Sequence, residues 1–598
     1  MKLSRALCAT TALATGLLIS GAAFAQSSGT AIVEELVVTG SNGPRNIGGS
    51  IVAIEEPKSR VGISEEFISR QMPGQTVLDT INLLPGVNFT NNDPFGSAGG
   101  DVVIRGIDSQ RIALLQDGVP LNDSGNYAIY PNQQLDSDLI ERVTVNLGTT
   151  DVDSPTAAAA GGTINYITKR ARDEFGVRAE VGAGDDNYQR YYATIESGAI
   201  GPFGTKMWIS GLYTKNDLFR PHNSPIKPGG KIEKKQFNAR IDQEFGDFGE
   251  ASLIFNYNEN RNNFYRNITL AQFKTNPQLE NDRSCSFDLP VNGTAQNDGN
   301  QSTVVTYNGT IIANTSCTNF HGLRINPSNT GNIRGQARFT LTDNLILTVD
   351  PSFQYVLANG GGYTAVSERS DQLDLGGPVG VDLNGDGDDL DTVALYSPNT
   401  TNTRRYGVTS SLIWDINDNN RVRIAYTGDF GNHRQTGDYG FFNDNGTPQN
   451  VFGGKDGYGR RVKAIDGSSL RRRDRFSKAI LNQVALEYRG QFMDDALTVI
   501  VGARAPYFKR ELNQYCYSRD GSSSVLCTTQ TPNAPLANGN VTFGTSTTQY
   551  IAPYSMTKKY NKVLPNLGMN WNFAENQYVY ASYAEGLSAP RTDNLYTP

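Results

Sequence analysis

Histidine, cysteine, tryptophan and long apolar runs are all scarce in this chain of 598 residues. Its 3 histidines leave little room for a conventional histidine-based metalloenzyme. After residue 25 there is no run of 18 apolar residues, which excludes a bilayer-spanning helix there. The 53 basic residues are outnumbered by 60 acidic ones, which argues against a general nucleic-acid-binding coat. At 19%, charged residues are also too few for a disordered chain.

Strand and turn formers are abundant instead, with 62 glycines, 28 tyrosines and 26 phenylalanines. From about Asp173 onward, segments of roughly ten residues alternate apolar with polar side chains. Clear examples are residues 251–258, 421–430 and 496–504. A period of two places the apolar set on one face of a β-strand. The composition and the pattern together predict a large protein that is mainly β.

The connections between these segments alternate in length. Gly246–Gly249 and Asn417–Asn420 have the composition of tight turns. Residues 262–333, 360–404 and 514–550 form long polar stretches. Short turns on one side and long loops on the other are typical of an outer-membrane β-barrel. A secreted β-sandwich or β-helix is the soluble alternative, and it does not need this asymmetry.

The first 25 residues have the pattern of a secretory signal peptide. Lys2 and Arg5 are followed by the apolar or small stretch 6–20, and Ala23-Phe24-Ala25 forms an A-x-A cleavage site. A membrane anchor is the alternative, although the apolar stretch is short. After cleavage four cysteines remain. Two local disulfides, Cys285–Cys317 and Cys516–Cys527, fit an oxidising compartment, and free thiols are the alternative.

Residues 46–170 differ from the barrel-like part, which covers residues 171–598. They contain short apolar strands and a helical stretch over Thr76–Leu84 that ends at Pro85-Gly86. We expect a small α+β domain, preceded by a leader at residues 26–45. Asp117-Gly118 has the composition of a turn, and we assign it no chemistry. Such a domain fits beside a barrel or inside its lumen, as in plugged barrels of about 22 strands.

Five blocks in this domain occur in the order and spacing of the plug of TonB-dependent outer-membrane receptors, which the chain therefore resembles. They are Thr76–Val87, Val102–Ile107, Arg111–Leu121, Ile140–Val145 and Ala160–Thr168. Upstream, Glu34–Gly40 resembles the TonB box of that family, and downstream Tyr578–Tyr596 resembles a barrel hairpin common there. Physically, Glu34–Gly40 is an extended β-prone stretch that is able to pair edge to edge with a partner strand. An ordinary disordered leader is the alternative.

The resemblance implies a transmembrane antiparallel β-barrel with the small domain as a plug in its lumen. It also implies active uptake of a scarce large solute across the outer membrane of a Gram-negative cell. Ferric siderophores are the commonest cargo, and cobalamin, haem or an oligosaccharide are alternatives. The implied partners are outer-membrane lipid, the extracellular ligand, and TonB with its inner-membrane proton-motive complex. No nucleic acid is implied.

Three other function classes compete with this interpretation. A signalling receptor of the same family is expected to carry an extra domain before the TonB box, and Glu34 lies only eight residues after Gln26. An enzyme is disfavoured because no G-x-S-x-G, P-loop or H-E-x-x-H motif occurs. A passive porin needs no separate N-terminal plug. The motifs therefore favour a transporter that performs no catalysis.

Candidate functional residues follow from the motifs and from the resemblance. For TonB docking we expect Glu35, Leu36, Val37, Val38, Thr39 and Gly40. Arg105, Arg111, Glu141 and Arg142 are expected to hold the plug against carboxylates of the barrel wall, because guanidinium groups bind carboxylates bidentately. A labile latch is a compatible interpretation. The resemblance implies that outward-facing plug loops touch the ligand, and by position these loops include Phe95, Gln110, Tyr127 and Tyr130, which alternatively only line the vestibule.

An acidic stretch at residues 382–391 nearly matches the start of a calcium-binding loop. Asp382, Asn384, Asp386 and the Asp388 carbonyl are suited to surround a structural calcium ion. Position twelve is Val393, where a bidentate glutamate belongs, and no helices flank the stretch. An acidic turn in an outer loop is the alternative, and no other cofactor is expected.

The barrel-like part contains fewer strands than a plugged barrel needs. About 13 strand-like segments are countable in residues 171–598, against roughly 22 in plugged transporters. The sequence also ends at Thr597-Pro598, soon after the hairpin-like motif. We therefore expect an incomplete barrel that lacks its C-terminal strands.

Overall fold

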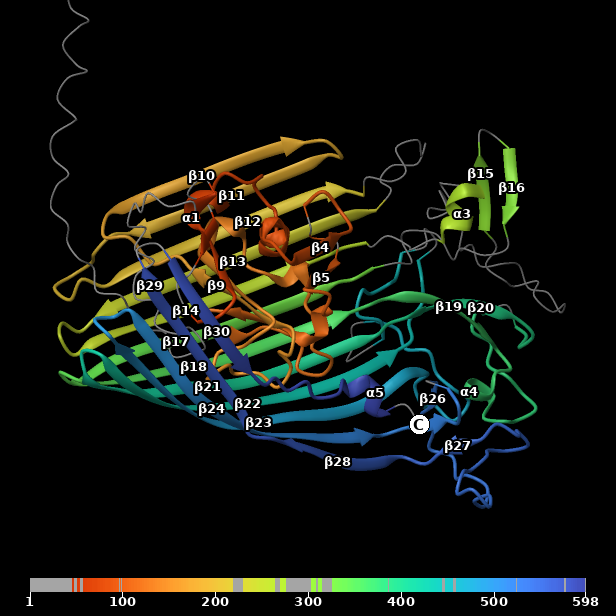
Figure 1. The fold of residues 1–598 in the computed structure, drawn as a ribbon. Helices are drawn as coiled ribbons and strands as arrows, with labels where there is room; N and C mark the ends of the chain where they lie inside the picture. The colour runs from red at the N-terminus through yellow and green to blue at the C-terminus, as the bar shows by residue number, and fades with distance from the viewer. Residues whose placement is uncertain are drawn as a thin grey trace, which may run out of the picture.

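The computed structural model describes most of the chain. The described residues are 46–47, 51–53, 57–95, 97, 99–218, 230–263, 269–275, 303–307, 310–314, 325–385, 387–443, 447–454, 459–522, 524–574 and 577–596. The predicted signal peptide, the TonB-box residues 35–40, Cys285, Cys317 and Asp386 lie outside them. Within them a long curved sheet forms a wall, and a small mixed domain lies on its concave side (Figure 1).

The wall is a sheet of 14 antiparallel strands, and sequence neighbours pair along it. Its strands are β10 (Phe175–Gly184), β11 (Tyr188–Ser197), β12 (Lys206–Asp217), β13 (Lys231–Glu244), β14 (Gly249–Asn260), β17 (Ser328–Thr342), β18 (Leu345–Asn359), β21 (Thr400–Asn417), β22 (Asn420–Asp438), β23 (Arg471–Phe492), β24 (Leu497–Gln514), β28 (Tyr554–Asn561), β29 (Leu564–Ala574) and β30 (Gln577–Ala584). β28 and β29 pair with successive halves of β24. In the described sheet β10 and β30 are the two edges, so the barrel is not closed.

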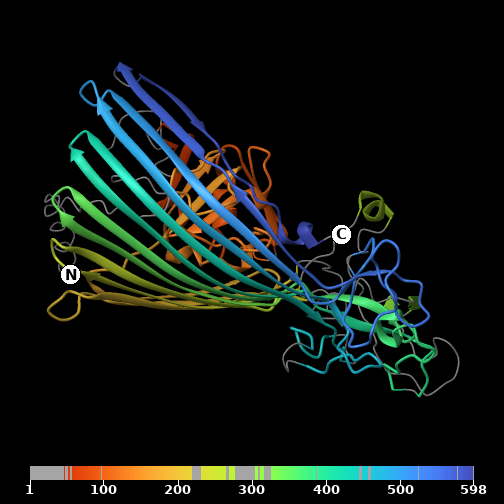
Figure 2. The same ribbon diagram turned by 90° about the horizontal axis from the view of Figure 1, so that it is seen from below.

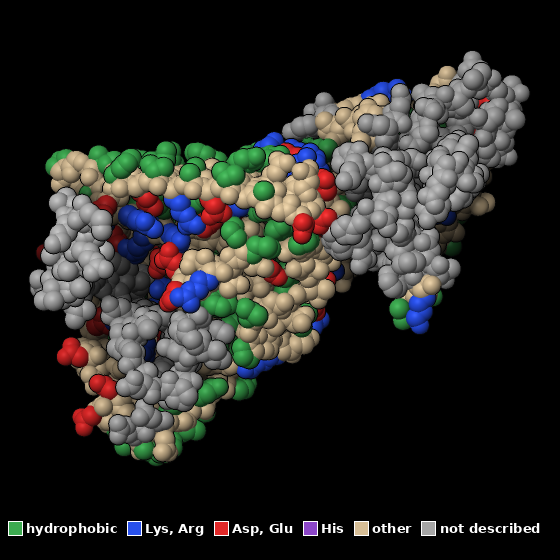
Figure 3. Space-filling view, turned by 90° about the horizontal axis from the view of Figure 1, so that it is seen from above, with side chains coloured by type: hydrophobic (Ala, Val, Ile, Leu, Met, Phe, Trp, Pro, Cys, Tyr) green, Lys and Arg blue, Asp and Glu red, His purple; other side chains and the backbone are tan. Residues whose placement is uncertain are grey.

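The period of two decides which side chains face the lumen. In β22, Ile424 and Tyr426 are exposed on the outer face, whereas Arg423 and Thr427 are buried on the inner face. Hydrophobic side chains cover the outside of the wall, and charged side chains gather in the hollow (Figure 3). An apolar outer band and a polar interior are the arrangement of a barrel in lipid. No helix among the described residues is both long and apolar enough to cross a membrane.

Short and long connections separate to opposite ends of the wall, as predicted. One turn joins the end of β13 at Glu244 to the start of β14 at Gly249, and another joins β21 to β22 between Asn417 and Asn420. The long connections gather at the other end, which we call the mouth (Figure 2). They contain α3 (Leu270–Thr275), β15 (Thr303–Tyr307), β16 (Thr310–Asn314), β19 (Gly362–Ser367), α4 (Asp371–Asp374), β20 (Thr392–Ser397), β25 (Tyr517–Arg519), β26 (Val525–Leu526) and β27 (Tyr550–Ile551).

The plug is built on a seven-stranded sheet in the order β1-β2-β3-β8-β9-β6-β7, in which β6 and β9 are parallel. Its strands are β1 (Asn46–Ile47), β2 (Ile51–Ala53), β3 (Arg60–Ser64), β6 (Ile112–Gln116), β7 (Val119–Pro120), β8 (Ile140–Leu147) and β9 (Gly162–Thr168), with the hairpin β4 (Val87–Asn91) and β5 (Gly100–Ile104) beside them. Short helical elements are α1 (Glu65–Ile68), α2 (Val77–Thr80), η1 (Ile81–Leu83), η2 (Ser109–Arg111), η3 (Pro131–Gln133) and η4 (Ser137–Leu139).

The helical stretch predicted over Thr76–Leu84 is present as α2 followed by η1. The side chain of Thr76 caps it by accepting a hydrogen bond from the Asp79 backbone N–H at 3.4 Å. Leu78 and Ile81 are fully buried in the plug core. The same core includes Trp208 and Leu212 of β12, so the plug packs directly on the wall.

Candidate functional site

Arginines of the wall hold carboxylates of the plug. Arg190 of β11 makes a bidentate pair with Asp136 at 2.8 and 3.0 Å. Arg423 of β22 contacts Asp153 at 2.8 Å. All four side chains are buried, where paired charges interact far more strongly than at a surface. The wall and the plug are therefore joined by desolvated, matched charges.

Asp117 is the most enclosed of the plug carboxylates. It contacts Arg334 of β17 at 3.1 Å, and both side chains are fully buried. It also accepts two hydrogen bonds from Thr168 of β9, whose backbone N–H and hydroxyl both donate at 2.7 Å. The sequence marked this position only as a turn, and its positive φ of 49° agrees with that. The turn also presents a carboxylate to the wall.

Three further wall arginines donate to plug carbonyls instead of carboxylates. Arg405 donates to the Asn122 carbonyl at 3.0 Å. Arg504 and Arg510 donate to the Ser154 and Ser124 carbonyls at 2.8 and 3.1 Å. Each guanidinium sits at an inward position of an alternating strand. Their inward position in an alternating strand is the signal by which the sequence could have identified these arginines.

Among the described residues, the four residues predicted to hold the plug against the wall contact other plug residues. Arg105 donates to Ser59, Arg111 lies 3.8 Å from Asp108, and Arg142 lies 4.0 Å from Glu141. All of these partners belong to the plug, and within the described residues none of the four reaches a wall carboxylate. Arg105 follows the buried Ile104 in a turn with a φ of 48°, which points its side chain to solvent. The buried plug–wall pairs described above join plug carboxylates to wall arginines, whereas Arg170, at the end of the plug, pairs with Glu250 of β14 at 3.0 Å.

A cavity of about 220 Å³ lies at the mouth of the wall. Its lining includes three arginines near the start of β23, namely Arg472, Arg473 and Arg475, and one acidic residue, Asp593 of α5 (Thr592–Tyr596). Asn399, Gln514, Ser518, Ser522, Ser524, Val525 and Tyr596 complete it. Three guanidinium groups against one carboxylate leave the cavity positively charged.

Arg473 is one of two largely buried members of this group, with a side chain 10% exposed against 11% for Arg475. Its terminal nitrogen makes only two long hydrogen bonds, at 3.4 Å, to the Asn399 carbonyl and the Thr401 hydroxyl. Its Nε has no hydrogen-bond partner among the described residues. A buried guanidinium with so few partners is suited to receive an anion.

The four predicted ligand-contact residues lie in different surroundings. Phe95 stacks on Tyr188 of β11 with ring centroids 4.1 Å apart. Tyr127 is buried beneath the Arg510 guanidinium, which lies 5.0 Å from its ring centroid. Tyr130 is exposed and Gln110 is half-buried. The structure does not bring the four together, and ligand contact by any of them stays a prediction.

The acidic stretch at 382–391 folds back on a buried glutamate. Glu368 accepts hydrogen bonds from the backbone N–H groups of Leu383 and Asp391 at 2.7 and 2.9 Å. Burial raises the pKa of Glu368. Ligand atoms of Glu368, Asp388 and Asp391 lie within 4.8 Å of one another. Of the predicted ligands, Asp382 instead accepts hydrogen bonds from Gly385 and Gly387, and calcium binding stays a prediction.

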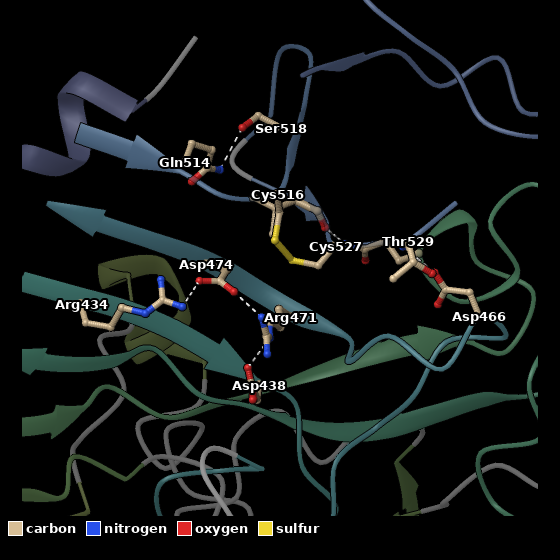
Figure 4. Close-up of a disulfide and its surroundings, with 12 residues drawn as sticks. Arg434, Asp438, Asp466, Arg471, Asp474, Gln514, Cys516, Ser518, Cys527 and Thr529 are labelled. Atoms are coloured by element: carbon tan, nitrogen blue, oxygen red, sulfur yellow. Dashed lines mark hydrogen bonds and ion pairs between the residues drawn. A yellow bond between two sulfur atoms is a disulfide. The ribbon is translucent and has the colours of Figure 1, made fainter. Parts of the chain in front are cut away.

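A disulfide joins Cys516 to Cys527 beside the mouth (Figure 4), with their Cα atoms 4.7 Å apart. Next to it, Asp466 accepts hydrogen bonds from the hydroxyl of Thr528 and the backbone N–H of Thr529. Burial opposes ionisation of Asp466, but hydrogen bonds from Ser468 and Thr528 outweigh it and hold its pKa below the ordinary value. These contacts connect the loop after β24 to the loop between β22 and β23.

The chain matches known proteins along almost its whole described length. A model of the TonB-dependent receptor plug domain matches residues 53–163, and a model of the TonB-dependent receptor β-barrel matches residues 176–598. Similar solved structures include the siderophore receptor PiuA from Acinetobacter baumannii, at 17% identity and a TM-score of 0.53, covering 91% of this chain and 67% of that one.

Two more solved structures show the same fold. The ferric-catecholate import receptor Fiu from E. coli K12 is 14% identical, with a TM-score of 0.55 and coverage of 88% of this chain and 69% of that one. The ferric yersiniabactin uptake receptor FyuA from Yersinia pestis is 13% identical, with a TM-score of 0.54 and coverage of 89% and 64%. The chain thus spans about two thirds of the length of these receptors. Because the β-barrel model alone matches well over half of it, the chain belongs to the TonB-dependent receptors, a family of outer-membrane transporters and receptors rather than of enzymes.

Proposed function

We propose that this receptor takes up an anionic iron chelate, a ferric siderophore, across the outer membrane. The observation that carries the proposal is the excess of arginine in the mouth cavity. Ferric chelates bearing carboxylate or catecholate oxygens present negative charge to their surroundings, and guanidinium groups bind such oxygens through short charge-assisted hydrogen bonds. A cavity lined by three arginines would bind cobalamin or a neutral oligosaccharide less strongly than it binds an anionic chelate.

The position of the plug favours active transport over passive diffusion as the function. It lies in the hollow of the wall and is attached to it by buried ion pairs, an arrangement that obstructs free diffusion through the lumen. In our proposal the signal peptide at 1–25 exports the chain, and Glu35–Gly40 pairs with TonB as an added strand. The proton-motive complex of the inner membrane then supplies the energy that moves the plug. The receptor itself performs no catalysis.

Binding and growth measurements test the cargo class. Purified receptor is titrated with ferric citrate, a ferric tris-catecholate, cobalamin and haem, with intrinsic fluorescence as readout. We expect ferric citrate or the ferric tris-catecholate to bind more tightly than cobalamin or haem. Arg473→Ala should weaken this binding roughly 10- to 100-fold, because a hydrogen bond to a charged group is worth about 1.5–3 kcal/mol. Arg519→Ala removes an exposed arginine from the same outer region and serves as the matched control. Equal loss in both variants, or tightest binding of cobalamin, would overturn the proposal.

Energy coupling has its own test. Val38→Pro removes one backbone N–H from the predicted docking strand, and proline is poorly tolerated inside a paired strand. We expect this variant to bind the chelate normally and to support no growth on it as the iron source. Val38→Thr keeps the N–H and is the control. Growth of the proline variant at the wild-type rate would exclude strand pairing at this segment.

A further inference from the structure

The segment after β30 leaves the wall and folds into the lumen. Residues 585–591 pass beside the plug and lead into α5, which lies between the wall and the outer loops (Figure 2). Ala589 donates its backbone N–H to the Ala157 carbonyl at 3.0 Å, and Ala159 donates to the Leu587 carbonyl at 3.4 Å. Thr592 donates its backbone N–H to the Gly125 carbonyl at 3.0 Å. The segment therefore lies against two parts of the plug, residues 157–159 and the turn 123–127.

The same segment is fixed to the wall. Arg510 of β24 donates to the Pro590 carbonyl at 3.1 Å and to the Thr592 hydroxyl at 2.7 Å. The buried hydroxyl of Tyr596 accepts a hydrogen bond from the Asn513 backbone N–H at 2.9 Å. The segment 585–596, which we call the inner strap, thus bridges the plug to the wall at the mouth.

Asp593 of the inner strap contacts both the wall and the plug. One carboxylate oxygen contacts Arg475 and lies 3.9 Å from Arg473. The other oxygen accepts a hydrogen bond from the Asn126 side-chain amide at 2.9 Å. The Asp593 backbone N–H donates to the Asn126 side-chain oxygen at 3.1 Å. A single carboxylate therefore partners the arginines of the mouth cavity and also holds the plug turn.

We propose that Asp593 is an internal anion that occupies the ligand site, and that an anionic group of the ligand displaces it. Displacement moves the carboxylate away from Arg475 and breaks its contact with Asn126. The plug turn 123–127 then loses part of its attachment to the strap. This inference rests on the proposed function, because it treats the arginine-lined cavity as the ligand site and gives that site a route to the plug.

Two consequences follow from the competition. An internal competitor reduces the apparent affinity for an external anion to the intrinsic affinity multiplied by the fraction of sites that it leaves free, so its removal strengthens binding. Coupling is also reciprocal: if the ligand loosens the turn, a turn that is already loose favours the ligand. If the role of Asp593 were purely structural, neither effect would be expected.

The test uses the full chain in detergent micelles, with sodium citrate and ferric citrate as probes. Hydrogen exchange at residues 123–127 reports the plug turn, and calorimetry reports affinity. In the wild type we expect citrate to speed exchange of this turn. In Asp593→Asn, which keeps the shape and one hydrogen-bonding oxygen, exchange is already fast and citrate binds about tenfold tighter. Glu511→Gln removes a carboxylate that pairs with Lys509 and Lys478 at the same rim, and should behave as the wild type.

Asn126→Ala provides a second variant that leaves the arginines in place. We expect fast exchange of the turn and citrate binding at least as tight as in the wild type. If ferric citrate binds through Arg473 while exchange at residues 123–127 does not change, the relay is wrong and the proposed function stands. If citrate speeds exchange but no ferric chelate is transported, the relay stands and the cargo is wrong. No citrate effect on either readout overturns the proposal.

Discussion

The plug–wall interface and the mouth use arginine in different ways. At the interface each buried guanidinium has a carboxylate or a carbonyl from the plug, as Arg334 has Asp117. At the mouth three arginines line one cavity with a single carboxylate, Asp593. Burying unmatched charge costs stability, so a fold retains it only where something else is gained. The matched set attaches the plug, and the unmatched set is available to an anionic ligand.

Asp117→Asn should give the largest loss at the matched interface. It leaves Arg334 buried without its charge partner, a change that typically costs about 3–5 kcal/mol. We expect hydrogen exchange of β9 in the plug to accelerate by more than two orders of magnitude, with wall strands unaffected. Asp101→Asn, at an exposed plug carboxylate, is the control. Unchanged exchange of β9 would mean that packing alone retains the plug.

Removing the disulfide should have the next largest effect, confined to the mouth. Cys516 and Cys527 close a loop with a sequence separation of 11, and crosslinks of this length contribute about 2–3 kcal/mol. We expect the paired change of both cysteines to serine to expose residues 517–526 to proteolysis. Exchange of β9 should stay as in the wild type, because its backbone hydrogen bonds are made with β6 and β8 of the plug. A plug loosened by the same change would show that the mouth and the interface are one unit.

The sequence predicted the local features because each depends on near neighbours. Val422 and Ile424 alternate with arginines, so the strand and its inward face follow from the period of two. Thr76 and Pro85-Gly86 bracket the helical stretch for similarly local reasons. The pairing across the lumen is different, since Asp117 and Arg334 are far apart in the sequence and charge alone does not say which partners meet. Arg105 shows the error that results, because an arginine beside an apolar strand fits a latch or an exposed turn equally well.

The mouth cavity was the least predictable feature. Arg472, Arg473 and Arg475 stand out in the sequence as a basic run, but a basic run is ordinarily a solvated surface. Asp593 lies more than a hundred residues further along the chain, beyond the whole of β24. Only the inward path of the strap brings that carboxylate to the arginines. A family motif at Tyr578–Tyr596 marked the region without indicating its role.

Asp151 allows the buried ion pairs within the plug to be titrated, because its partners are Lys58 and Arg60. Burial alone would raise its pKa, but Arg60 and Lys58 outweigh burial and lower it to about 2. A carboxyl whose folded pKa lies below its ordinary value of 3.8 stabilises the plug above that value, by about 2 kcal/mol. This contribution is lost as the pH falls from about 4 to about 2. We expect Asp151→Asn to weaken the plug at pH 7 and the difference to vanish in that window, as measured by hydrogen exchange.

Asp79 is the control for this titration, because burial raises its pKa. A carboxyl with a raised pKa contributes stability that increases as the pH falls. Asp79→Asn should therefore lack the acid-dependent loss. An equal pH response in both variants would attribute the effect to the net charge of the plug instead of to the ion pairs of Asp151.

Arg472→Ala should give the smallest effect and sharpen the contrast within the mouth itself. Arg472 is exposed whereas Arg473 is buried, although both line the same cavity. Water screens an exposed charge, and such pairs contribute about 0.2–1 kcal/mol, so ferric-chelate affinity should fall less than about fivefold. The slope of affinity against salt should fall as well, since the exposed charge acts mainly at long range. Losses as large as those of Arg473→Ala would show that net charge, and not burial, makes this cavity a site.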